Sequence, residues 1–145
     1  MKKTEKSEKK IMLKNNLSEI RKVREGIEDF GRSNKLSKED TFDANLALEE
    51  IVVNIISYAY KNNEERLIEV DLKVNEVELE MKVKDDGKQF DPLAKSAPNC
   101  KLPVEQKEPG GWGIHLVRNI MDELEYRRRN EKNILIMRKK LTKPE

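Results

Sequence analysis

Residues 68–87 read IEVDLKVNEVELEMKVKDDG, and the rest of the fold can be inferred outward from them. Apolar side chains occupy every second position, at 68, 70, 72 and 74 and again at 77, 79, 81 and 83. A period of two is typical of a strand with one buried face. Because Asn75 and Glu76 interrupt the alternation, we expect two strands joined by a tight turn into an antiparallel hairpin. Other elements must cover the apolar face of this hairpin.

The segments around the hairpin predict those covering elements. Apolar positions spaced by three or four residues predict helices, and Ser18 and Ser37 are expected as the N-caps of the first two. Hairpins with helices grouped elsewhere indicate an α+β fold, a two-layer sandwich whose mixed, mainly antiparallel sheet carries helices on one face. The expected elements are a strand over 11–17, helices over 18–31, 37–61 and 114–121, and strands over 124–129 and 133–141.

Length and composition indicate a single domain with an ionic surface. Charged residues make up 40% of the 145 positions, yet 30 basic residues nearly cancel 28 acidic ones, which excludes a chain-wide field for nucleic acid or membrane. Cys100 is the only cysteine, so an internal disulfide is excluded. Charges interrupt every apolar run well before the ~18 residues of a membrane-spanning helix. We therefore expect a cytoplasmic protein with a disordered basic tail over 1–10 and one domain over 11–142.

The second helix carries polar residues where a buried helix should have none. Residues 46–60 are apolar nearly all round, yet they include Glu49, Glu50, Asn54 and Ser57. Glu50 and Asn54 are four positions apart and share one face of the helix, which Ser57 continues. A buried carboxylate is costly unless it is paired, metal-bound or open to a cavity, so this stripe indicates a pocket for a cation or ligand. The alternative is that this face is simply exposed to solvent.

Two glycine-containing stretches add further candidates. Asp85 and Gly87 follow the hairpin within VKDDGKQFDP, although an acidic residue before a glycine is also typical of an ordinary turn. Gly110, Gly111 and Gly113 open the third helix, and free backbone N–H groups at a helix start bind phosphate. Such a start is weak evidence alone, and neither a Walker motif nor a dinucleotide-binding motif is present.

These three stretches occur in an order that resembles a known family, the small anti-sigma factor serine kinases of bacterial partner-switching systems. LALEEIVVNIISYAY (46–60) is similar to the family's N box, and VKDDGKQFDP (83–92) to its first glycine box. GGWGIHLVRNIMDELEY (110–126) is similar to its second glycine box. The resemblance covers about residues 11–142. It implies the histidine-kinase-like ATP-binding fold of the GHKL ATPase superfamily, to which gyrase and histidine-kinase ATP-binding domains also belong.

The resemblance implies ATP and Mg²⁺ as cofactors and a role for each matching residue. Asn54 matches the residue that holds Mg²⁺ against the nucleotide phosphates. Glu50 matches the general base that accepts the proton of a protein serine during phosphoryl transfer. Asp85 matches the aspartate that accepts a hydrogen bond from the adenine amino group, and Gly87 the glycine that lets the backbone approach the base. The glycines whose backbone amides would meet the phosphates are Gly110, Gly111 and Gly113.

Some features leave parts of this assignment open. Gln89 stands where the wider superfamily has a second glycine. Variants that contain the sequence FDP resemble the anti-sigma subgroup, so the difference is interpreted as subgroup identity. Glu49 adjoins Glu50, although the one-turn spacing to Asn54 favours Glu50 as the base. The nucleotide lid would span 93–109, and its phosphate-binding lysine is not assigned. The candidate lysines are Lys95, Lys101 and Lys107.

By this resemblance the chain is expected to be a protein-serine/threonine kinase. It would phosphorylate an antagonist protein of the STAS type and sequester a sigma factor or a similar regulator, and a homodimer is the implied assembly. The alternative is a non-catalytic protein-binding module in which ATP only sets the conformation of the lid. Direct nucleic-acid binding is not expected, because glutamates at 123, 125 and 131 alternate with the arginines of the last hairpin.

Overall fold

The described part of the chain is built on one sheet of five strands. The computed structural model describes residues 7–60, 64–94 and 111–142. The strands follow the order β1-β2-β3-β5-β4, and every neighbouring pair is antiparallel, so the described sheet is more regular than the mixed, mainly antiparallel one expected. The strands are β1 (Glu8–Lys14), β2 (Leu67–Val74), β3 (Glu78–Asp85), β4 (Glu123–Arg129) and β5 (Lys132–Lys140).

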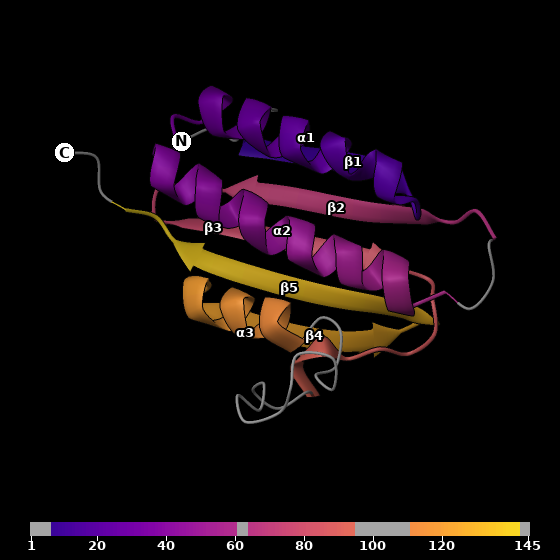
Figure 1. The fold of residues 1–145 in the computed structure, drawn as a ribbon. Helices are drawn as coiled ribbons and strands as arrows, with labels where there is room; N and C mark the ends of the chain where they lie inside the picture. The colour runs from indigo at the N-terminus through magenta and orange to yellow at the C-terminus, as the bar shows by residue number, and fades with distance from the viewer. Residues whose placement is uncertain (1–6, 61–63, 95–110, 143–145) are drawn as a thin grey trace.

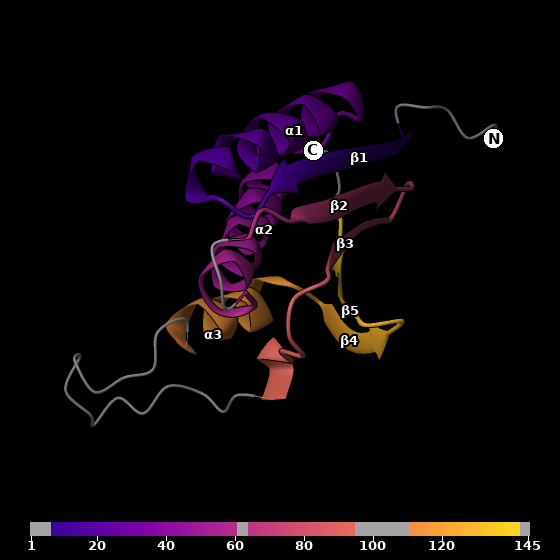
Figure 2. The same cartoon turned by 90° about the vertical axis from the view of Figure 1, so that its right-hand side faces the viewer.

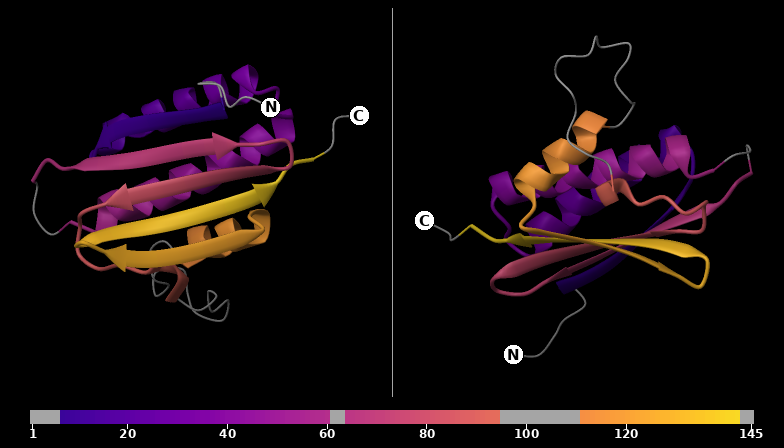
Figure 3. Two further views of the ribbon diagram at one scale, coloured as in Figure 1. Left: turned by 180° about the vertical axis from the view of Figure 1, so that it is seen from behind. Right: turned by 90° about the horizontal axis from the view of Figure 1, so that it is seen from below.

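Helices cover one face of the sheet and leave the other face open (Figures 1 and 2). Views from behind and from below show the same two layers, with α2 lying between α1 and α3 (Figure 3). This arrangement confirms the expected two-layer α+β sandwich. The α-helices among the described residues are α1 (Ile20–Ser33), α2 (Lys38–Tyr58) and α3 (Gly111–Ile120), and short 3-10 segments lie at Leu17–Glu19 and Pro92–Ala94.

The β2–β3 hairpin has the register that the alternation predicts. Val70 pairs with Val83 and Leu72 with Met81, and all four side chains are buried. The side-chain oxygen of Asn75 accepts hydrogen bonds from the backbone N–H groups of positions 77 and 78, both at 2.8 Å. Such side-chain bonds to the following backbone close a turn, so the predicted turn is confirmed.

The core lies between the sheet and the helices, with α2 at its centre. This helix is apolar on most sides because it packs against the sheet and against both other helices. Its central place brings its polar residues close to the sheet. Although α2 is long, no helix among the described residues is both long and apolar enough to cross a membrane. The buried apolar residues of α2 are Ala44, Ala47, Leu48, Ile51, Val52 and Ile55.

The two predicted helix starts have different outcomes. Ser37 caps α2 as expected, because its hydroxyl accepts a hydrogen bond from the Asp40 backbone N–H at 3.0 Å. The prediction of Ser18 as the N-cap of α1 is wrong. Asn16 accepts a hydrogen bond from the Ser18 backbone N–H and starts a 3-10 turn in its place. The α-helix therefore begins later, at Ile20.

The first strand begins earlier than the sequence predicts. Residues 1–10 are expected to form a tail, yet the chain pairs with β2 from Glu8 onward. Within β1 the only buried residues are Ile11 and Leu13. An edge strand has one neighbouring strand and tolerates charged side chains, so the first three residues of β1 carry no apolar signal. Residues 1–6 of the expected tail lie outside the described residues.

Candidate functional site

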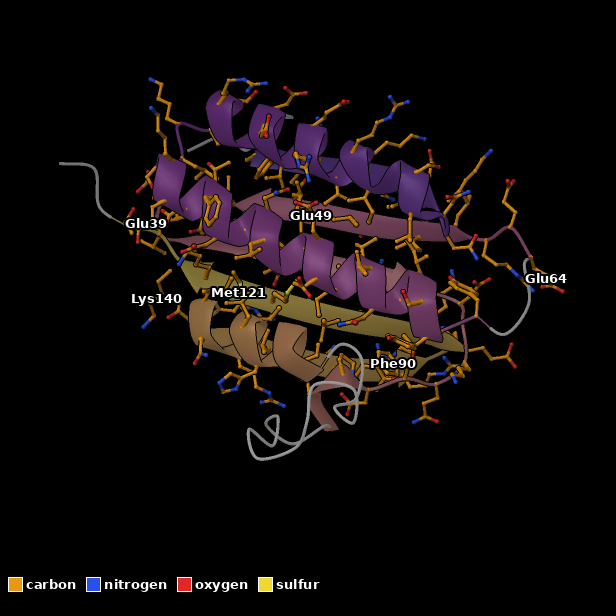
Figure 4. All side chains as sticks on the ribbon, viewed as in Figure 1. Glu39, Glu49, Glu64, Phe90, Met121 and Lys140 are labelled. Carbon is orange, nitrogen blue, oxygen red and sulfur yellow. The ribbon has the colours of Figure 1, made fainter. Side chains whose placement is uncertain are left out.

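The two adjacent glutamates of α2 point in different directions. Glu49 lies on the side of α1 (Figure 4), where its carboxylate accepts hydrogen bonds from Arg24, at 2.8 Å, and from Asn45. Glu50 lies on the side of α3, and its Oε2 atom contacts Gly113. Both glutamates are half-buried, so neither fits the alternative of a face in open solvent. The structure thus separates a glutamate tied to α1 from one that faces the glycine-rich start of α3.

Asn54 lies one turn after Glu50 and has a buried amide with an unused donor. Only 4% of the residue is exposed, and its Nδ2 atom has no hydrogen-bond partner among the described residues. A buried unsatisfied donor costs about 1–3 kcal/mol. A half-turn of the amide places the acceptor Oδ1 in the same position, so the group can serve a ligand of either polarity. Ser57, the third member of the predicted stripe, is exposed and does not line the pocket described below.

Asp85 ends β3 as a buried carboxylate held in one orientation. The residue is 3% exposed. Its Oδ1 atom accepts hydrogen bonds from the Gly87 backbone N–H, at 2.9 Å, and from Nδ2 of Asn133, at 3.0 Å. Burial raises the pKa of Asp85, and these two hydrogen bonds offset the rise only in part. An oriented acceptor in a buried site suits the role that the resemblance implies, a hydrogen bond from a ligand amino group.

Asn133 on β5 organises the same site, and the sequence prediction missed it. Its Nδ2 atom donates to the Lys88 carbonyl, at 2.8 Å, as well as to Asp85. Its Oδ1 atom accepts from the Phe90 backbone N–H, at 3.2 Å, and from the Tyr126 hydroxyl, at 2.5 Å. Four hydrogen bonds from one buried side chain therefore join β5, β4 and the segment that follows β3.

Gly87 is required by packing against α2. A Cβ atom at this position would lie 2.7 Å from Cβ of Ala59 and 2.9 Å from the Ala59 carbonyl carbon. The Lys88 backbone N–H donates to the Ala59 carbonyl at 2.8 Å, and Arg128 donates to the Gly87 carbonyl at 2.8 Å. The turn is thus held between the end of α2 and β4. The close approach seen here is to α2, whereas the resemblance implies an approach to the base.

Asn54, Asp85 and Asn133 line one small pocket between α2 and the sheet. Phe90, labelled in Figure 4, and Pro92 also line it. The cavity measures about 10 Å³, which is near the lower limit for a single water molecule. A nucleobase needs far more room, so binding one here requires the segment with Phe90 and Pro92 to move. The remaining lining residues are Ile51, Ile55, Val83, Tyr126 and Leu135.

The predicted phosphate-binding region is described only in part. α3 begins at Gly111, and Gly113 lies on its first turn beside Glu50. Among the described residues, no group of three or more His, Cys, Asp or Glu side chains is placed to hold a metal ion. A Mg²⁺ ion would therefore need the phosphates of its nucleotide as further ligands beside the amide of Asn54. The predicted ligands outside the described residues are Gly110, Lys95, Lys101 and Lys107, whose roles stay predictions.

Two arginines of the last hairpin, Arg127 and Arg138, are paired with acidic side chains. Arg138 lies 3.1 Å from Glu80, 3.3 Å from Glu123 and 3.6 Å from Glu125. Arg127 also pairs with Glu125. This pairing offsets the charge of two of the arginines that could contact phosphate. The expectation of no direct nucleic-acid binding stays a prediction.

Known proteins with related sequences are kinases and anti-sigma factors. The serine/threonine-protein kinase BtrW of Bordetella bronchiseptica is 27% identical over 77% of this chain and 78% of its own length. The serine-protein kinase RsbW of Oceanobacillus iheyensis is 29% identical over 72% of this chain and 67% of its own length. The anti-sigma F factor of Clostridium perfringens is 27% identical over 71% of this chain and 74% of its own length.

A solved structure and a family model complete the comparison. The structure of the RsbU and RsbW domains of Rv1364c from Mycobacterium tuberculosis matches 94% of this chain with a TM-score of 0.66 and 15% identity. The chain spans about one third of that structure, 33% of its length. The model of the histidine kinase-like ATPase domain matches residues 13–139. These matches confirm the resemblance found in the three sequence boxes, and the chain belongs to the histidine kinase-like ATPase domain family.

Proposed function

We propose that the chain is an ATP-dependent protein-serine/threonine kinase that also acts as an anti-sigma factor. The observation that carries this proposal is the buried Nδ2 atom of Asn54, which has no hydrogen-bond partner among the described residues and lies in the same pocket as Asp85, one turn from Glu50. A buried polar atom with no such partner fits a site completed by a ligand. The names of the relatives, serine-protein kinase and anti-sigma F factor, support the same activity.

The nucleotide would be held at both sides of the pocket. Asp85 would accept a hydrogen bond from the adenine amino group, because Asn133 and Gly87 hold its carboxylate in place. Asn54 would bind the Mg²⁺ ion of the nucleotide. Bound ATP would supply the phosphoryl group, and its metal would neutralise the charge that develops on the phosphate oxygens.

Glu50 would act as the general base. The hydroxyl of the target serine would give up its proton to this carboxylate as its oxygen attacks the γ-phosphorus of ATP. The bond from that phosphorus to the bridging oxygen would break, and ADP would leave with its electron pair. Glu49 is unsuited to this role, because its carboxylate is already bound by Arg24 and Asn45 on the far side of the helix. The contacts of Glu49 therefore favour Glu50 as the base, and the one-turn spacing to Asn54 independently favours the same residue.

The proposal extends to partners. The serine substrate would lie on an antagonist protein of the STAS type, and the sequestered regulator would be a sigma factor or its equivalent. The kinase would work as a homodimer in the cytoplasm, where sigma factors meet RNA polymerase. Phosphorylation of the antagonist would leave the regulator bound to the kinase.

Thermal unfolding with ATP or ADP, each with and without Mg²⁺, tests the nucleotide site. A ligand at ~100 times its dissociation constant adds about 2.7 kcal/mol, which raises Tm by several degrees in a domain of this size. The shift should depend on Mg²⁺ and disappear in Asn54→Ala. Asn45→Ala, on the same helix but outside the pocket, is the control and should keep the shift. The absence of a shift with any nucleotide in the wild type would remove the proposal.

Transfer of labelled γ-phosphate to a STAS-domain protein of the same organism tests the kinase itself. Glu50→Gln should abolish transfer and keep the nucleotide-dependent shift in Tm. Glu49→Gln is the matched control and should transfer phosphate at a rate close to that of the wild type. A nucleotide-dependent shift with no transfer by the wild type would instead favour the non-catalytic module.

A further inference from the structure

The N box and the second glycine box meet at Glu50 and Gly113. The direction that a side chain would take at Gly113 is filled by the Glu50 carboxylate, whose Oε2 atom occupies that space. The carboxyl carbon lies 3.1 Å, and Cγ 3.7 Å, from where a Cβ atom of residue 113 would stand. α2 and α3 pack side by side at this level (Figure 1). Any residue other than glycine at 113 therefore competes with Glu50 for the same volume.

Among the described residues, no hydrogen bond or ion pair holds the Glu50 carboxylate. Glu49 shows the contrast, because Arg24 and Asn45 both bind its carboxylate. Within the described part of the chain, the Glu50 carboxylate is therefore positioned by packing, with Gly113 in contact with its Oε2 atom. A general base needs this combination, since it must be placed within about 2.6–3.2 Å of the proton that it accepts while its oxygen stays free of other donors.

We propose that Gly113 is a positioning residue, whose missing side chain sets the place of the Glu50 carboxylate for phosphoryl transfer. This inference rests on the proposed function, in which Glu50 accepts the serine proton. The resemblance gives Gly113 a different task, a backbone amide that meets phosphate. The two tasks predict different defects, because one concerns the rate of transfer and the other the binding of nucleotide.

Gly113→Ala separates these tasks without unfolding the protein. The group in the way is the far end of a flexible side chain, so the carboxylate moves and the backbone stays. Alanine is also the better helix former, which favours α3. A misplacement of about 1 Å at a reacting group lowers the rate on the order of 100-fold. We expect kcat for transfer to fall by about that factor, with the nucleotide dissociation constant and KM unchanged.

The decisive measurement repeats Gly113→Ala in a variant with a shorter carboxylate at position 50. Glu50→Asp withdraws the carboxylate by one methylene, so adding Gly113→Ala to this variant should lower kcat far less than it does in the wild type. Asn119→Ala, an exposed position of the same helix, is the control and should leave kcat unchanged. An equal loss in the wild-type and Glu50→Asp backgrounds would overturn the inference, as would a Gly113→Ala defect confined to nucleotide binding.

A crystal structure of Gly113→Ala gives a readout that does not depend on activity. The Glu50 carboxylate should be displaced from α3, with the helices unmoved. An unmoved carboxylate would refute the role of Gly113 even if the wild type is an active kinase. The carboxylate could instead be displaced while the wild type transfers no phosphate. That result would confirm the steric contact between Gly113 and Glu50. It would refute the proposed function, and with it the role of Gly113 in catalysis.

Discussion

Replacing Asn133 with leucine removes four hydrogen bonds from the site and keeps the number and branching of the side-chain heavy atoms. Asp85 loses one of the two donors to its buried oxygen, and a hydrogen bond to a charged group contributes about 1.5–3 kcal/mol. The Tyr126 hydroxyl loses its acceptor, at a cost of about 1 kcal/mol. The backbone groups of Lys88 and Phe90 are only part-buried and can turn to water. We expect a loss of about 2.5–4 kcal/mol in the free energy of unfolding.

Urea unfolding of Asn133→Leu measures this loss directly, and thermal unfolding should show a fall in Tm of roughly 10 °C. The same substitution at exposed Asn119 is the control and should change stability by less than about 0.5 kcal/mol. In an Asp85→Ala background Asn133→Leu should cost clearly less, because the charged partner is gone. An equal cost in both backgrounds, or a cost below about 1 kcal/mol in the wild type, would refute the account of this network.

Other variants probe the remaining contacts of the site. Burial raises the pKa of Asp85 above its ordinary 3.8, so the folded protein holds this proton more tightly than the unfolded chain, and stability falls as the pH rises from 3.8 through the folded pKa. Asp85→Asn keeps the Oδ1 acceptor and removes the titrating group. Urea unfolding across that pH window should therefore show a flatter dependence of stability on pH and greater stability at pH 7, while ATP affinity falls. An unchanged pH dependence would contradict the raised pKa of Asp85. Gly87→Ala should destabilise by about 1–3 kcal/mol in urea, because its Cβ would press on the backbone of Ala59. Glu49→Ala should cost only about 0.2–1 kcal/mol, since Arg24 is 56% exposed, and calorimetry should show an unchanged ATP affinity.

The fold could be predicted from the sequence wherever one face of an element is buried. The alternation in β2 and β3 predicts the hairpin correctly because Val70, Leu72, Met81 and Val83 are all buried on one face of the sheet. β1 also alternates buried and exposed positions, yet it lies at the sheet edge and buries only two residues. Its start at Glu8 has no apolar signal, so no pattern could separate it from the charged residues that precede it.

The site could be predicted where its residues are neighbours along the helix. The four-residue spacing predicts that Glu50 and Asn54 share one face. The structure gives Asn54 a buried amide at a pocket and places Glu50 against Gly113. Asp85 and Asn133 are 48 positions apart, and only the sheet brings them together. A signal did exist, because Asn133 takes an inward position on a strand whose next inward residues are Leu135 and Met137. A polar residue in such a row needs a buried partner.

The pocket is complete on the side of the sheet and incomplete on the side of α2. Asn133 uses both ends of its amide within the protein, and Asp85 has two donors, whereas Nδ2 of Asn54 has no partner among the described residues. Asp85 should therefore keep its orientation when a base binds, although the segment with Phe90 and Pro92 must move to make room. The Asn54 side, by contrast, gains its contacts only when a ligand arrives.

This asymmetry gives Asn54 a distinctive thermodynamic signature. Removing an unsatisfied buried donor takes away a cost of about 1–3 kcal/mol along with some packing, so Asn54→Ala should leave the ligand-free protein as stable as the wild type or more so. With ATP and Mg²⁺ the order should reverse, because only the wild type gains from the ligand. A variant that is weaker by the same amount with and without nucleotide would show that Asn54 is a structural residue and that its amide serves the fold alone.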